Sequence, residues 1–182
     1  MRLYTGKGDQ GTTDLLGERV GKDDPRIGLI GALDETTSLI GFARAVSRVE
    51  RSNEWAIEVQ RDLYQIMAEL AFTDALRPDA YVLPPERVTR ISEMTDQLSA
   101  EIELPRHFVL PGDTVGGGAF DVARAVARRA EREAVTLDQS EHTVNPEILR
   151  YLNRLSSLLF MLARQEDQAE GVTPLKAKQQ AS

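Results

Sequence analysis

Residues 145–164 read NPEILRYLNRLSSLLFMLAR, and this stretch decides the fold. Asn145 and Pro146 predict a helix start, because asparagine caps a helix and proline fits its first turn. The apolar side chains behind them follow at steps of four and three residues: Ile148, Leu152, Leu155, Leu159 and Leu162. This heptad-like spacing predicts a helix with one apolar seam that packs against other helices.

Similar periodicity predicts four further helices. We expect them at about residues 25–48, 55–71, 88–102 and 119–136. Strand candidates are limited to residues 2–5 and 108–110, and residues 112–118 are expected to form a loop. Aromatic residues are 5% of the chain, so the core must be mostly aliphatic. The expected fold is all-α: a five-helix bundle with a four-helix-bundle-like core and an N-terminal glycine-rich loop.

The 182 residues suit one domain, expected at residues 1–165. Within it, residues 1–24 would form an N-terminal loop and residues 25–165 the helical bundle. Residues 166–182 are polar and end in KAKQQAS, so we expect a disordered tail.

Composition excludes several classes of protein. With 22 basic and 29 acidic side chains the net charge is −7, which argues against a nucleic-acid partner. The absence of cysteine excludes disulfide scaffolds, iron–sulfur clusters and thiol nucleophiles, and two histidines argue against a multi-histidine metal centre. Apolar stretches are too short to cross a bilayer, and we expect no signal peptide, no membrane partner and a cytoplasmic location.

The densest chemical signal is the stretch Thr5–Thr13, TGKGDQGTT. Glycines let the backbone approach an anion closely, and successive N–H groups form an anion-binding nest. Gly6, Gly8 and Gly11 match the dinucleotide-binding spacing, but no buried strand precedes them and no βαβ unit follows. A Walker phosphate loop would need lysine where Thr12 stands. A flexible N-terminal arm remains the alternative.

Residues 124–132, RAVARRAER, form an arginine stripe on the fourth predicted helix. Four of these residues share one helix face: Arg124, Arg128, Glu131 and Arg132. Guanidinium groups bind phosphate oxygens in a bidentate geometry, so the stripe suits a polyanion. The alternative is a solvated face whose Arg–Glu pairs each contribute about 0.3–0.5 kcal/mol.

Other polar residues give weaker signals. Asn153, Ser157 and Arg164 recur on one side of the last helix, which is also what an ordinary amphipathic helix shows. The pair Asp34-Glu35 is either exposed or supplies a carboxylate to an arginine of the stripe. The two histidines are expected at the surface, and no catalytic triad or carboxylate pair stands out.

Three motifs occur together in this chain: T-x-x-G-D-x-G-x-T from Thr5, R-x-x-x-R-R-x-E-R from Arg124 and L-N-R-L-S from Leu152. With KDD at residues 22–24 and LDE at residues 33–35, the sequence resembles the PduO-type ATP:cob(I)alamin adenosyltransferases over about residues 3–164. The resemblance implies a homotrimer with active sites between subunits. It also implies transfer of the 5′-deoxyadenosyl group of ATP to cob(I)alamin, with inorganic triphosphate as the leaving group. A non-catalytic carrier of ATP or cobalamin is the alternative function.

The resemblance also assigns roles to individual residues. ATP would be bound by Thr5, Gly6, Lys7, Gly8, Asp9, Gly11, Thr12, Thr13, Lys22, Arg128, Arg129, Glu131, Arg132 and Asn153. Arg128, Glu131 and Phe108 would be catalytic, with Phe108 covering the lower face of the corrin ring. Asp34 of one subunit would pair with Arg124 of its neighbour beside the cobalamin.

The resemblance further implies that Mg²⁺ is held through the ATP phosphates, with Glu131 as the candidate side chain. A reductase and an adenosylcobalamin-dependent enzyme are the implied partners. Two positions depart from the family pattern: many relatives have a basic residue in place of Gly6, and aspartate is common in place of Ser157.

Overall fold

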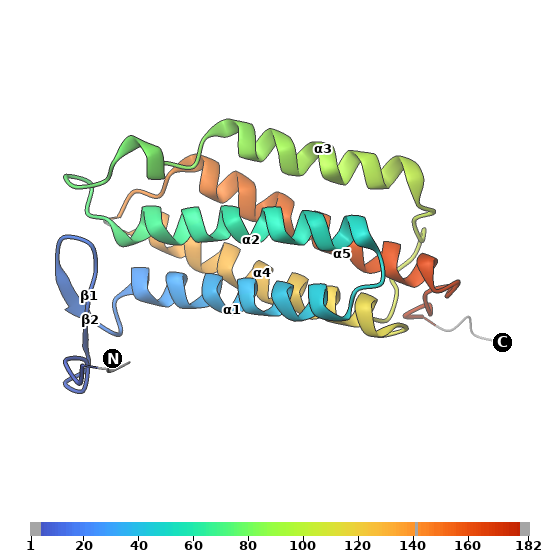
Figure 1. The fold of residues 1–182 in the computed structure, drawn as a ribbon, viewed down its shortest axis with the longest axis horizontal. Coiled ribbons are helices and arrows are strands. Elements are labelled where there is room, and N and C mark those ends of the chain that lie inside the picture. Colours follow the sequence, from blue (N-terminus) through green and yellow to red (C-terminus); the bar gives the residue numbers. More distant parts are fainter. Residues whose placement is uncertain (1–4, 141, 179–182) are drawn as a thin grey trace.

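The computed structural model describes residues 5–140 and 142–178, and five α-helices dominate this part of the chain (Figure 1). The helices are α1 (Pro25–Val46), α2 (Glu50–Ala71), α3 (Pro85–Glu101), α4 (Val115–Asp138) and α5 (Pro146–Ala169). A short 3₁₀ helix, η1 (Asp79–Tyr81), lies between α2 and α3. The predicted five-helix, all-α fold is therefore confirmed.

Two helix starts follow the sequence signals closely. Asp24 caps α1 by accepting a hydrogen bond from the Arg26 backbone N–H at 2.8 Å, and Pro25 occupies the first turn. Asn145 caps α5 in the same way, through the Glu147 backbone N–H at 3.0 Å. These caps depend only on local sequence, which is why they could be predicted.

The strands of the structure differ from those predicted from the sequence. Most of the candidate at residues 2–5 lies outside the described residues, and residues 108–110 form a single bridge between Val109 and Lys176. The sequence reading missed an antiparallel hairpin of β1 (Thr12–Asp14) and β2 (Arg19–Gly21), in which Thr12 pairs with Gly21. Each strand has three residues, too few for an alternating apolar pattern to show.

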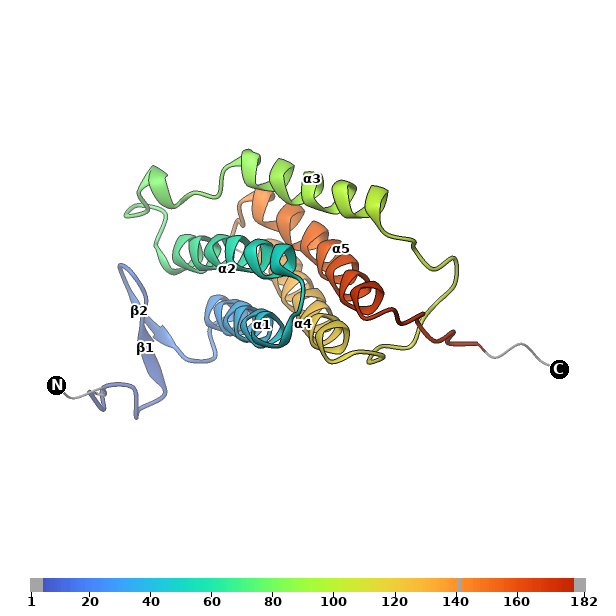
Figure 2. The ribbon, with the colours of Figure 1, turned by 45° about the vertical axis from the view of Figure 1, so that its right-hand side comes forward.

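The helices pack as a ring around one core (Figures 1 and 2). Helix α1 packs against α2 and α4, α4 packs against α5, and α5 packs against α3. Ion pairs join α3 to α2: Arg87 lies 3.1 Å from Asp62, and Arg90 lies 3.1 Å from Glu58. The helices therefore enclose an apolar interior with charged pairs along one seam.

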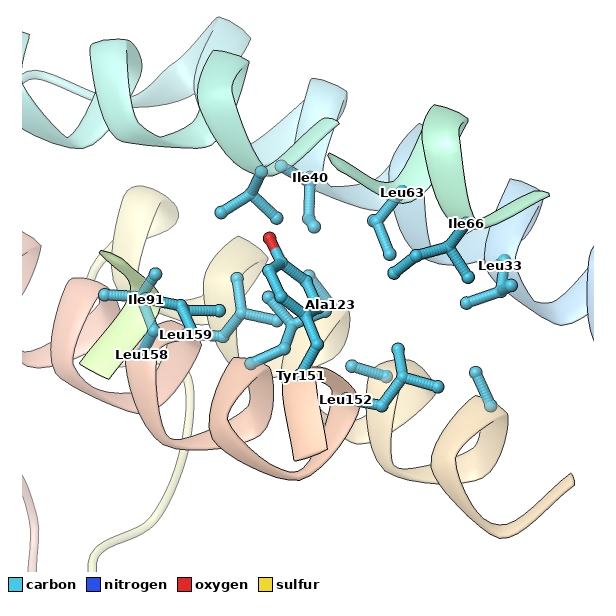
Figure 3. Close-up of a cluster of buried hydrophobic side chains, with 14 of the residues drawn as sticks. Leu33, Ile40, Leu63, Ile66, Ile91, Ala123, Tyr151, Leu152, Leu158 and Leu159 are labelled. Carbon is cyan, nitrogen blue, oxygen red and sulfur yellow. The ribbon is translucent and has the colours of Figure 1, made fainter. Parts of the chain in front are cut away.

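The core is mostly aliphatic, as expected, with one buried tyrosine near its centre. Figure 3 shows Tyr151 of α5 among leucine and isoleucine side chains of the surrounding helices. Its hydroxyl donates a hydrogen bond of 2.9 Å to Oδ2 of Asp62, which is itself buried. Burial raises the pKa of Asp62 and raises the pKa of Tyr151 well above its ordinary value.

Helix α4 starts earlier than predicted, because the glycines at positions 116–118 are helical rather than part of a loop. Thr114 caps the helix by accepting a 2.9 Å hydrogen bond from the Gly117 N–H. A Cβ at Gly116 would lie 2.7 Å from Oε2 of Glu166, and one at Gly117 would collide with the carboxylate of Asp167. The glycines therefore let two carboxylates of α5 reach the N-terminus of α4, where the helix dipole favours negative charge.

The predicted disordered tail is wrong for residues 166–178. Helix α5 continues to Ala169, and the chain then returns along the segment between α3 and α4. The Leu110 N–H donates to the Leu175 carbonyl, and the Ala177 N–H donates to the Phe108 carbonyl, both at 2.8 Å. Polar composition suggested disorder, but these backbone hydrogen bonds need no apolar side chains.

Candidate functional site

The glycine-rich stretch Thr5–Thr13 forms consecutive tight turns ahead of the hairpin. The Asp9 N–H donates to the Gly6 carbonyl at 3.2 Å and the Gly11 N–H to the Gly8 carbonyl at 3.1 Å. Gly6 and Gly11 have φ of +70° and +77°, a region that other residues rarely adopt. The stretch therefore has the tight, glycine-dependent backbone that close approach to an anion requires.

Lys22 lies against this loop. Its backbone N–H donates to the Gly11 carbonyl at 2.9 Å, which continues the pairing of the hairpin. A Cβ at Gly8 would lie 3.1 Å from the Lys22 ammonium nitrogen. The missing side chain at Gly8 thus leaves room for the Lys22 ammonium group beside the loop.

Arg19 is a residue of this loop that the sequence reading missed. Its guanidinium donates to the Thr12 hydroxyl oxygen, to Asp14 at 2.6 Å and to the Lys7 carbonyl at 2.6 Å. Arg19 therefore ties the hairpin to the glycine-rich turns. The hairpin register, which places Asp14 opposite Arg19, was the missing signal.

The arginine stripe leaves two guanidinium groups exposed on α4. Within the described residues, no carboxylate forms an ion pair with Arg128 or Arg132. Arg132 donates only to the Arg128 carbonyl, at 3.0 Å. Next to them, the Asn153 side-chain amide of α5 donates to Glu131 Oε1 at 2.8 Å. The structure thus brings together four predicted ATP-binding residues from two helices.

Arg129 points toward α1, where it forms an ion pair with Glu35. It also lies 4.0 Å from Glu133. Glu35 of the pair Asp34-Glu35 therefore supplies a carboxylate to an arginine of the stripe, which was one of the two alternatives for this pair. Asp34 itself is exposed. Asp34 makes no ion pair with Arg124 inside the chain, and Arg124 pairs with Asp121 at 3.0 Å.

Phe108 lies in the segment between α3 and α4, and 89% of its surface is exposed. Its backbone is held by the C-terminal segment, so the ring is presented on an anchored loop. Beside it lies a cavity of about 590 Å³, whose lining includes Phe108, Asp121, Arg124, Phe160 and Arg164. The cavity walls are part apolar and part charged, as suits a large ligand that carries polar side groups.

The predicted ATP loop and the segment that carries Phe108 lie at opposite ends of the helical bundle. Figure 1 shows the hairpin at the end where α1 begins, whereas the segment between α3 and α4 lies at the other end. Among the described residues, no hydrogen bond or ion pair joins the loop Thr5–Thr13 to Arg128 or Arg132. A single copy of the chain therefore presents the predicted parts of the site without assembling them.

Residues 3–166 match the protein family described as cobalamin adenosyltransferase. The chain belongs to this family. A corrinoid adenosyltransferase of Bacillus subtilis is 35% identical over 189 residues, which covers all of this chain and 94% of that protein. The corrinoid adenosyltransferase PduO of Salmonella typhimurium is 35% identical over 169 residues, covering 92% of this chain. The family member described here spans about half the length of that relative.

Solved structures show the same adenosyltransferase fold. A variant PduO-type ATP:corrinoid adenosyltransferase from Lactobacillus reuteri, complexed with cobalamin and ATP, matches with a TM-score of 0.90 and 27% identity. The match covers 98% of this chain and all of that one. A second variant of the Lactobacillus reuteri protein, complexed with ATP, matches with a TM-score of 0.86 and 28% identity.

Proposed function

We propose that this chain transfers the 5′-deoxyadenosyl group of ATP to cob(I)alamin and releases inorganic triphosphate. One observation carries the proposal: a chain of the cobalamin adenosyltransferase family exposes two guanidinium groups that have no carboxylate partner among the described residues, beside the Glu131–Asn153 pair. Exposed like charges on one helix face repel each other, and a bound polyanion offsets that cost.

The reaction needs no protein nucleophile. The electron pair of Co(I) attacks the ribose 5′ carbon, a Co–C bond forms, and the C–O bond to the triphosphate breaks with its electrons left on the leaving group. Arg128 and Arg132 would stabilise the growing negative charge on the triphosphate, and the loop Thr5–Thr13 with Lys22 would wrap its other end. The protein thus contributes position and electrostatics.

Glu131 and Asn153 would hold the nucleoside and its metal-bound phosphates, with Arg129 supporting this arrangement through its bond to α1. The described residues contain no cluster of three or more acidic or histidine side chains that could hold a metal. Mg²⁺ fits as an ion held mainly by triphosphate oxygens, with Glu131 as one protein ligand. When bound, it would neutralise phosphate charge.

Phe108 would cover the lower face of the corrin ring. Its exposed ring stands at the rim of the cavity of about 590 Å³. By displacing the lower axial ligand, it would leave Co(II) four-coordinate and easier to reduce. This role uses axial ligation, which is a general way for proteins to tune a bound metal.

We further propose a homotrimer with active sites between subunits. Exposed apolar side chains on α1 and α4 support it: Phe42 is 57% exposed and Val122 is 51% exposed. Asp34 is exposed on α1 and Arg124 is partly exposed on α4, so both side chains are accessible to a neighbouring copy. A neighbouring copy would also bring a loop and a Phe108 together. A cytoplasmic location, a reductase and an adenosylcobalamin-dependent acceptor complete the proposal.

An anaerobic assay tests the reaction directly. Purified protein is mixed with ATP, Mg²⁺ and chemically reduced cobalamin, and the Co(I) absorbance is followed while adenosylcobalamin and triphosphate are quantified. The expected result is one triphosphate released per adenosylcobalamin formed. A carrier protein would bind both ligands and release no triphosphate, and that outcome would reject the proposed activity.

A further inference from the structure

Arg164 of α5 is the centre of a buried charge network. Its side chain is 3% exposed, and its Nη2 donates to Asp121 Oδ2 at 2.7 Å while its Nε donates to Asp167 Oδ2 at 2.9 Å. The other oxygen of Asp167 accepts a 2.8 Å hydrogen bond from the Thr114 hydroxyl. The N-cap of α4 and two carboxylates therefore fix the position of one buried arginine.

Asp121 connects this network to Arg124. Its Oδ1 accepts a hydrogen bond from Arg124 Nε at 3.0 Å, while its Oδ2 is held by Arg164. The Asp121 side chain is 4% exposed and that of Arg124 is 31% exposed. A guanidinium has five N–H donors in a planar fork, so a bond at Nε orients the group and leaves its terminal nitrogens for another anion.

The network ends at the cavity beside Phe108. Asp121, Arg124 and Arg164 all line that cavity, and the Arg164 guanidinium lies 5.1 Å from the ring of Phe160, which also lines it. The exposed pair Arg128 and Arg132 is not part of this lining. The buried network therefore acts on the wall next to Phe108 and is separate from the residues assigned to the triphosphate.

We propose that Asp121 is a positioning residue for corrinoid binding: held by Arg164 and Asp167, it orients the Arg124 guanidinium in the cavity wall beside Phe108. The inference rests on the proposed function and extends it to a residue that acts through Arg124. A preoriented arginine loses less side-chain freedom when it meets the corrinoid or a carboxylate of the neighbouring subunit. Losing the Asp121 carboxylate should therefore weaken corrinoid binding and leave ATP binding unchanged.

Asp121→Asn and Arg124→Lys test this, alone and combined. Each single variant should raise the KM for cob(I)alamin and the dissociation constant for cob(II)alamin about tenfold, the loss expected for one charge-assisted hydrogen bond. The KM for ATP should stay within about twofold, as should the values for a matched exposed control, Asp74→Asn. Because Asp121 acts through Arg124, the double variant should be no worse than Arg124→Lys alone.

A merely structural role predicts a different pattern. It would lower the melting temperature and impair ATP and corrinoid binding together, or it would give multiplicative effects in the double variant, and either result overturns the proposal. If Asp121→Asn does not fold, the wild-type protein supplies the test by NMR. The Arg124 Nε–H should exchange with solvent at least about tenfold more slowly than that of exposed Arg128, and equal rates would overturn the proposal.

Cob(II)alamin binding is measured by titration without turnover, so the two proposals fail separately. Wild-type protein that binds cob(II)alamin but forms no adenosylcobalamin would reject the proposed function and leave the Asp121 comparison intact. Normal turnover with unchanged corrinoid binding in Asp121→Asn would reject the positioning role alone.

Discussion

Arg128 and Arg164 carry the same guanidinium group, yet the protein treats the two residues in opposite ways. Arg164 is 3% exposed and contacts two carboxylates, whereas Arg128 is exposed and pairs with none among the described residues. A buried charge must be neutralised inside the protein, because removing it from water costs several kcal/mol. An exposed charge can be left for a ligand. The contrast separates arginines that hold the fold from arginines that are available to bind.

The largest effect is expected at the buried arginine. Arg164→Ala would leave Asp121 and Asp167 buried without their shared partner, so the free energy of unfolding should fall by about 3–5 kcal/mol. Urea unfolding followed by circular dichroism measures this. A loss below about 1 kcal/mol would show that the buried network is not a major contributor to the stability of the fold.

The exposed arginine should show the reverse pattern. Arg128→Ala should lower kcat by at least about 100-fold, because it removes a group that stabilises the leaving triphosphate. Its free energy of unfolding should change by less than about 0.5 kcal/mol, as is usual for exposed positions. The adenosylcobalamin assay and urea unfolding measure the two quantities. Arg61→Ala, at an exposed arginine of α2, is the matched control. Full activity in Arg128→Ala would contradict the triphosphate clamp.

Two phenylalanines extend the comparison to uncharged side chains. Phe120 is fully buried and Phe108 is 89% exposed. Phe108→Ala should therefore change the free energy of unfolding by less than about 0.5 kcal/mol. It should slow adenosylation that starts from cob(II)alamin more than adenosylation supplied with cob(I)alamin. Equal losses in the two assays would remove the proposed displacement of the axial ligand.

The smallest effect is expected at Asp62, a buried carboxyl group that can be compared with the buried charge of Arg164. Its Oδ1 makes no hydrogen bond, although Arg87 Nε lies 3.1 Å away, and burial raises its pKa above 3.8. As the pH rises from about 3.8 through the raised pKa, the unfolded state releases this proton first, so Asp62 lowers the free energy of unfolding.

The variant Asp62→Asn keeps an acceptor for Tyr151 and cannot titrate. Its stability relative to wild type should therefore improve with rising pH across that window, by at most about 1.4 kcal/mol per pH unit. Urea unfolding at several pH values from about 3.5 to about 7 measures the difference, because this range spans ordinary and raised carboxyl pKa values. A difference that is constant with pH would contradict the assigned effect of burial.

Much of the candidate site could be predicted from the sequence because its signals are local. Glu131 and Arg128 lie three residues apart on one helix face, and Gly6 to Gly11 is a continuous stretch. The contacts that were missed join distant parts of the chain. The sequence pattern placed Arg164 on the polar side of the last helix, but its partner Asp121 lies 43 residues away in the chain. No periodicity within one helix contains that information.

The sequence by itself determined the five helices, the caps of α1 and α5 and the arginine stripe, since the apolar side chains of an amphipathic helix repeat with a period of about 3.6 residues. Tertiary structure alone decided that Gly116 and Gly117 lie in the first turn of α4, because the carboxylates of Glu166 and Asp167 on α5 occupy the space that their missing side chains leave. It also decided that residues 175–177 pair with the segment around Phe108. Those features depend on chain segments more than 45 residues apart, and the geometry between them exists only after the helices have packed.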